Sequence, residues 1–79
     1  MLEHHDLVHE FPEHRQRIHD LKLADHHFAR LFTEYHDLTK EVERIEAGAE
    51  AASDDRLTDL RKHRLHLKDE LYAILVKAA

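Results

Sequence analysis

Apolar residues recur at alternating steps of three and four along the middle of the chain. The series comprises Leu21, Ala24, Phe28, Leu31, Tyr35, Leu38, Val42 and Ile45. This is the heptad spacing of an amphipathic helix, and it places every member on one face. Such a face is stable in water only when it packs against another helical surface. The pattern therefore predicts an all-α protein organised around this stretch.

The helix that carries this series is expected to span residues 12–46. Pro12 lacks an N–H and has a fixed φ that suits the first helical position, and Glu13 adds negative charge at the positive end of the helix dipole. No further Gly or Pro interrupts the chain before Gly48, which can adopt the left-handed conformation that ends many helices. At 1.5 Å per residue, this helix would be roughly 50 Å long.

A second helix is predicted over residues 54–77. Ser53-Asp54-Asp55 is a start signal, because a capping side chain is followed by acids in the first turn. Its own heptad series comprises Leu57, Leu60, Arg64, Leu67, Leu71 and Ile74. Arg64 is the basic member of this apolar series. Its methylenes can be buried while its charge reaches the edge of the helix or pairs with an acid on a partner.

The N-terminal residues 2–10 form a short amphipathic helix in this interpretation. His4, Leu7, Val8 and Phe11 follow the i, i+3, i+4, i+7 spacing of one helical face. Because a residue that precedes proline is restricted to extended conformations, Phe11 should separate this segment from the long helix by a bend.

Two heptad helices joined by a short polar connector at residues 47–53 predict an antiparallel, coiled-coil-like two-helix hairpin. Residues 1–79 would form one domain, with the N-terminal helix as an extension. The second helix reaches back only to about Ala24, so the apolar residues before it lack a partner within the chain. We therefore expect a dimeric helical bundle, or a higher homo-oligomer. The expected interaction surface comprises Leu7, Val8, Phe11, Ile18, Leu21, Phe28 and Phe32.

Charge is unevenly distributed along the 79 residues, whose net charge is −5 with histidine neutral. Residues 1–50 carry twelve acids against six bases, and residues 51–79 carry five against six. The acidic first half argues against binding to nucleic acid, which requires clustered Lys and Arg. The basic run Arg61-Lys62-His63-Arg64 is distributed around a helix and forms no single patch. No stretch approaches the ~20 apolar residues of a membrane span, and no signal peptide is recognisable, so a cytoplasmic protein is expected.

The ten histidines are the feature that suggests chemistry. His5 and His9 stand four residues apart and would share a helical face, which makes them candidate metal ligands. The stretch lacks the Glu that follows the first His in zincins, and no third ligand is defined, so solvated histidines are the preferred interpretation. The chain contains no cysteine and no glycine-rich phosphate loop, and two helices are expected to offer no concave pocket of their own. We therefore predict no catalytic residue, no cofactor and no enzymatic activity.

Several segments of the chain resemble the YdcH-like family of small bacterial proteins of unknown function. They are Phe11-Pro12-Glu13, the stretch from Ile18 to Lys22, Phe28 with Leu31-Phe32, Tyr35-His36, and the closing stretch from Leu65 to Leu71. The resemblance covers about residues 5–77, and its most specific parts are the FPE opening and the LKDEL close. It implies a short helical, cytoplasmic protein that can form a coiled coil. It brings no activity, cofactor or catalytic residue.

The predicted function is that of a non-enzymatic structural or interaction protein. It would self-associate through its heptad helices and could serve as a small adaptor for another protein. The alternative is a binding module that responds to metal or pH through its histidines. A nucleic-acid accessory protein is the third possibility.

Overall fold

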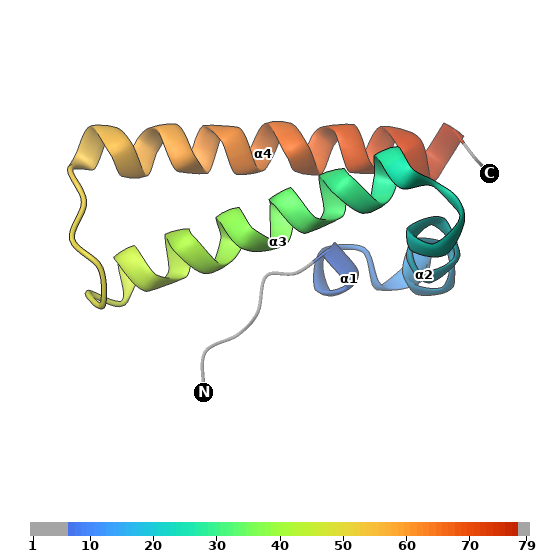
Figure 1. Ribbon diagram of the computed structural model, residues 1–79, viewed down its shortest axis with the longest axis horizontal. Helices are drawn as coiled ribbons and strands as arrows, with labels where there is room; N and C mark the ends of the chain where they lie inside the picture. The colour runs from blue at the N-terminus through green and yellow to red at the C-terminus, as the bar shows by residue number, and fades with distance from the viewer. Residues whose placement is uncertain (1–6, 78–79) are drawn as a thin grey trace.

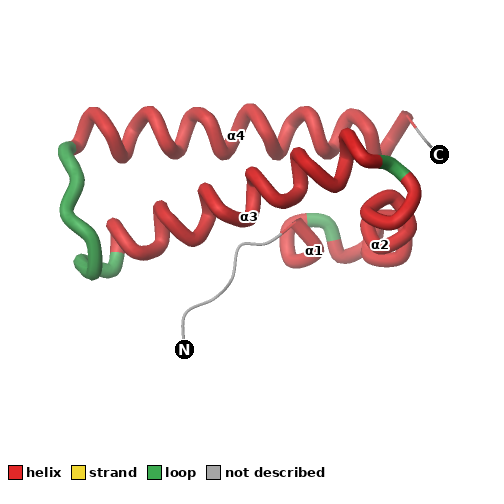
Figure 2. Tube along the Cα trace, in the orientation of Figure 1, coloured by secondary structure: helices red, strands yellow, loops and turns green. Residues whose placement is uncertain are grey.

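The fold was obtained as a computed structural model, which describes residues 7–77 (Figures 1 and 2). Every regular element in this range is helical, which confirms the all-α class. In chain order the elements are α1 (Leu7–Glu10), the 3-10 helix η1 (Pro12–His14), α2 (Arg15–Ala24), α3 (His26–Glu46) and α4 (Asp54–Lys77). The molecule is elongated and thin, with extents of 39 × 25 × 17 Å.

The two long helices, α3 and α4, run side by side in opposite directions and are joined at residues 47–53 (Figure 1). Both contribute side chains to one continuous core, as their heptad series predict. The core cluster contains Phe28, Leu31 and Tyr35 from α3 and Leu67, Leu71 and Leu75 from α4. Leu75 is not a member of the predicted series, and Val42 is buried outside this cluster. Each of the larger side chains contributes roughly 1.5–3 kcal/mol by leaving water. Packing between these two helices is therefore the main source of stability.

The connector is defined by a glycine cap and a serine cap. Gly48 has φ +78°, and its N–H donates to the carbonyl of Ile45 at 3.1 Å. The N–H of Ala49 donates to the carbonyl of Arg44 at 2.9 Å. These two bonds form a Schellman motif, which satisfies carbonyls that the end of α3 would otherwise leave unpaired. Gly48 thus has the left-handed role that the sequence predicts.

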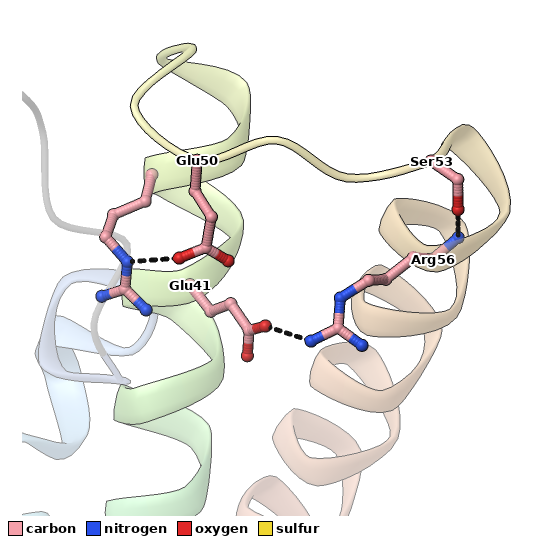
Figure 3. Close-up of polar contacts among 5 residues, drawn as sticks. Glu41, Glu50, Ser53 and Arg56 are labelled. Carbon is pink, nitrogen blue, oxygen red and sulfur yellow. Dashed lines mark hydrogen bonds and ion pairs between the residues drawn. The ribbon is translucent and has the colours of Figure 1, made fainter.

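The start of α4 is held by its cap and by an ion pair to α3 (Figure 3). Ser53 Oγ accepts the N–H of Arg56 at 3.1 Å, which satisfies one of the free donors of the first turn. The guanidinium of Arg56 donates to Glu41 Oε2 at 2.6 Å. A second cross-helix pair joins Arg61 to Glu46 at 2.5 Å. These exposed pairs orient the two helices near the connector more than they stabilise them.

The predicted continuous helix over residues 12–46 is wrong, because the chain bends at Asp25. This residue is extended, with φ −126° and ψ 108°. Its N–H donates to the carbonyl of Leu21 at 2.9 Å and closes α2, while its Oδ1 accepts the N–H of Phe28 at 3.0 Å and caps α3. One side chain therefore ends one helix and begins the next. The capping bond replaces the helical bonds that a straight helix would have made.

The bend folds the N-terminal third of the chain back onto the hairpin. In Figure 1, α2 is seen nearly end-on, whereas α3 and α4 run across the view. Leu7 and Ile18 are 0% and 1% exposed, and both belong to the core cluster that contains Phe28, Leu71 and Leu75. The expectation that the residues before Ala24 lack a partner within the chain is therefore wrong. They pack on the open end of the same two helices.

The segment around Pro12 is attached to the side of α4. Phe11 breaks the helical path as predicted, with φ −130° and ψ 66°, and Pro12 then opens η1, not a long helix. The ring of Phe11 stacks on that of Tyr72, with centroids 4.9 Å apart. Lys68 Nζ lies 3.3 Å from Glu10 Oε2. A stacked ring pair and a half-buried ion pair therefore join the first described residues to the last helix.

The cap at Asp25 leads to a specific prediction. Asp25→Ala should lower the free energy of unfolding by about 1 kcal/mol, because the first turn of α3 loses its acceptor. Asp25→Asn retains a capping oxygen and should restore most of this stability. Urea denaturation of the three proteins measures the difference. A variant Asp25→Ala as stable as the parent would show that the bend does not depend on this hydrogen bond.

Candidate interaction surface on α4

The outer face of α4 carries a stripe of exposed apolar side chains. Leu65, Tyr72 and Val76 are 56%, 42% and 44% exposed. They are spaced by seven and four residues, so they lie on one side of the helix. Leu67 and Leu71, which are buried, point from the opposite side into the core. We call Leu65, Tyr72 and Val76 the outer stripe of α4.

A hollow of about 400 Å³ lies beside the outer stripe, so the expectation that the chain offers no concave pocket is wrong. Leu65 belongs to both. The residues that line the hollow are Glu10 from α1, Tyr35 from α3, and Arg61, Arg64, Leu65 and Lys68 from α4. Three cationic side chains therefore surround this depression together with a single carboxylate, in a chain whose overall charge is negative. We call it the basic hollow.

The predicted interaction surface lies elsewhere and is largely covered. Its members Leu7, Ile18 and Phe28 are fully buried in the core. Its other members are partly buried and pack against the same core: they are Val8, Phe11, Leu21 and Phe32. The ammonium of Lys22 also lies over the ring of Phe32, 4.3 Å from its centroid. Among the described residues, the large apolar side chains that are exposed are instead those of the outer stripe and Leu23 on α2, which is 78% exposed.

Sequence reasoning missed the outer stripe although its signal is present. The heptad series of α4 accounts for Leu67 and Leu71 of the core but not for Leu75, and the outer stripe also falls outside it. A search for a second apolar line on the same helix would have found them, since they repeat at helical spacing. Apolar residues on both sides of one helix indicate that a second face, besides the one in the core, can pack against another surface.

The structure describes no metal site at the candidate ligands His5 and His9. His9 is exposed on α1, and His5 lies outside the described residues. Within residues 7–77, no group of three or more His, Asp or Glu side chains is close enough to hold a metal ion. In the same range, no helix has the length and apolar character needed to cross a membrane.

Comparison with known proteins gives a family but no activity. Residues 28–75, more than half of the chain, match the model of a family described as a protein of unknown function, DUF465. No curated protein and no solved structure matches the chain. The matched range begins in the first turn of α3 and ends near the end of α4, so it covers the hairpin and the outer stripe through Tyr72.

Proposed function

Because the chain belongs to the DUF465 family of unknown function, we propose its function from its surface. It is a non-enzymatic interaction protein that self-associates through α4. The YdcH-like proteins that the sequence resembles are the same family. The outer stripe of α4 is the observation that carries this proposal. Large apolar side chains in line on an otherwise charged helix are typical of a surface that packs against another helix.

Charge favours a second copy of this chain as the occupant. Residues 1–50 have a formal charge of −6 and residues 51–79 have +1, from the counts given above. A contact between two α4 helices therefore joins the nearly neutral parts of two molecules and keeps their acidic parts apart. A contact between two α3 helices would instead join acidic surfaces, because α3 carries five acids against three bases, and like charges weaken association.

The outer stripe is also self-complementary when two α4 helices pack antiparallel. In this arrangement Leu65 lies against Tyr72 of the second copy, and Tyr72 lies against its Leu65. Between these two apolar contacts, Lys68 of each chain lies beside Asp69 of the other. Lysine has three donor hydrogens, so Lys68 can keep its bond to Glu10 while it meets this carboxylate. Such a twofold contact uses one patch twice, as closed dimers do.

A stripe of three side chains makes a small interface. Stable complexes bury about 1,200–2,000 Å² in total, and one helix–helix contact of this length falls at or below that range. The dimer should therefore be in equilibrium with the monomer at micromolar concentrations. A chain that folds by itself and associates reversibly is suited to a regulated structural role. The same face is the one that would receive a helix of another protein if the chain serves as an adaptor.

Sedimentation equilibrium of the full chain and of Leu65→Glu tests this proposal. The parent protein should show a concentration-dependent dimer, and Leu65→Glu should weaken dimerisation at least about tenfold, because a charge would be buried in the contact. Since Leu65 is 56% exposed in the monomer, the variant should keep its helical content and melting temperature.

Leu23→Glu is the matched control. Leu23 is more exposed than Leu65 but lies on α2, away from the outer stripe, so the same change there should leave dimerisation unaffected. Equal weakening in both variants would indicate a general charge effect and contradict the role of α4. A parent protein that stays monomeric at millimolar concentration would exclude self-association altogether.

A further inference from the structure

The basic hollow contains a cation, Arg64, that no side chain among the described residues 7–77 neutralises. Arg61 is paired with Glu46 at 2.5 Å, and Lys68 is paired with Glu10 at 3.3 Å. Arg64, between them on α4, is half-buried and makes no hydrogen bond or ion pair with another residue of the described range 7–77. Its guanidinium carries five N–H donors in a fixed planar arrangement. This side chain therefore has donors to offer to a ligand.

The position of Arg64 on α4 also favours the binding of an anion. It stands in the heptad series of α4, where the other members are apolar, and it lines the hollow together with Tyr35 and Leu65. Partial burial removes water from a guanidinium and makes its interaction with an anion stronger than it would be on an open surface. An arginine held in this way is a better anion ligand than a solvated lysine.

The other walls of the hollow indicate what the anion is attached to. Leu65, which is 56% exposed, offers aliphatic surface, and Tyr35, which is 2% exposed, lines the hollow from α3. A volume of about 400 Å³ falls within the roughly 300–1,000 Å³ of pockets that hold small molecules. The combination of apolar walls with cationic side chains suits an amphiphilic anion better than an inorganic ion.

We propose that the basic hollow binds a small organic anion, with a carboxylate or phosphate head on Arg64 and an apolar or aromatic body against Leu65 and Tyr35. Arg61 and Lys68 flank the head, and their remaining N–H donors can reach it while they keep their ion pairs. A planar guanidinium can donate two parallel hydrogen bonds to either kind of head. The hollow shares Leu65 and Lys68 with the proposed dimer contact, but the two proposals fail independently, because anion binding is measured by ligand titration and self-association by sedimentation.

Titration with phenyl phosphate and with benzoate, followed by amide chemical shifts in NMR, tests the site. At least one probe should saturate, with shifts concentrated at Arg64, Leu65 and Tyr35. The probe with the lower dissociation constant identifies the preferred head group. Comparing phenyl phosphate with inorganic phosphate gives the contribution of the apolar body to the affinity. Arg64→Gln should raise the dissociation constant about tenfold or more, because one charge-assisted contact is lost.

Lys62→Gln is the control for this experiment. It removes the same charge from the same helix at an exposed position that does not line the hollow. Binding should be unchanged in this variant. The proposal would be overturned if both substitutions weakened binding equally or if the shifts spread over all cationic residues. It would also be overturned if no probe saturated at about 10 mM, ten times a dissociation constant of about 1 mM. A fold test by circular dichroism shows that each variant keeps its helices.

Discussion

Replacing Phe28 with alanine is expected to lower the free energy of unfolding by about 3–5 kcal/mol. Phe28 is 0% exposed and occupies the first turn of α3, where this helix, α2 and α4 share one core. Removing its ring leaves a cavity that the neighbouring side chains can fill only in part. Because small domains have total stabilities of about 5–15 kcal/mol, this single change removes a large share. Urea denaturation followed by circular dichroism measures it.

Phe32→Ala is the comparison that makes this result interpretable. It deletes the same atoms from the same helix, but Phe32 is only partly buried, at the edge of the core. The loss should be smaller, about 1–2 kcal/mol, because less apolar surface returns to water. Equal losses for the two phenylalanines would contradict the placement of Phe28 at the centre of the core.

The second large effect is expected at Ile18, on the helix that the bend folds back. Ile18→Ala should cost about 2–5 kcal/mol, because this side chain is 1% exposed and packs in the shared core. The cost should appear at protein concentrations where the chain is monomeric, since the contacts that are lost lie within one molecule. Thermal and urea unfolding at two concentrations establish both points.

Leu23→Ala on the same helix supplies the reference. Leu23 is 78% exposed, so its truncation should change stability by no more than about 0.5 kcal/mol. If Ile18→Ala left the monomer as stable as the parent and weakened only self-association, the N-terminal segment would be part of an intermolecular interface. That outcome would restore the surface first predicted from the sequence.

The helix ends illustrate what could be predicted from the sequence and why. Gly48 and Ser53 act through bonds to residues within five positions, so their roles depend little on the rest of the fold. The heptad series of α3 and α4 likewise identified the core, because burial on a helix follows its period. These features are local or periodic, and a single sequence contains them.

Asp25 shows why the rest of the fold was not predicted. The apolar series passes through Leu21, Ala24 and Phe28 without a gap, so the period alone indicates one continuous helix. A single extended residue changes the direction of the chain without changing this pattern, because Ile18 and Phe28 still face the same core. The available signal was an aspartate, a good capping residue, placed three positions before a buried aromatic residue. An aspartate is equally common on the solvated face of a continuous helix, so this signal alone does not identify a cap.

The candidate site was predictable in type but not in position. Exposed apolar surface was expected, but on the wrong helices, because the chain covers its own N-terminal overhang and leaves the outer stripe of α4 open. The basic hollow depends on Glu10, Tyr35 and Arg64, which three different helices bring together. No spacing in the sequence relates these residues, so only the tertiary structure places them side by side.

The single extended residue at Asp25 also separates the backbone of the N-terminal segment from that of the hairpin. Residues 7–24 are joined to the hairpin by one backbone position and by side-chain packing, and every backbone hydrogen bond within α3 and α4 survives if they separate. Sub-global opening of such a segment requires less free energy than complete unfolding. It would uncover the core at Phe28, Leu71 and Leu75 while the hairpin and its outer stripe stay folded. We therefore expect the hairpin to outlast the N-terminal segment when the protein opens locally.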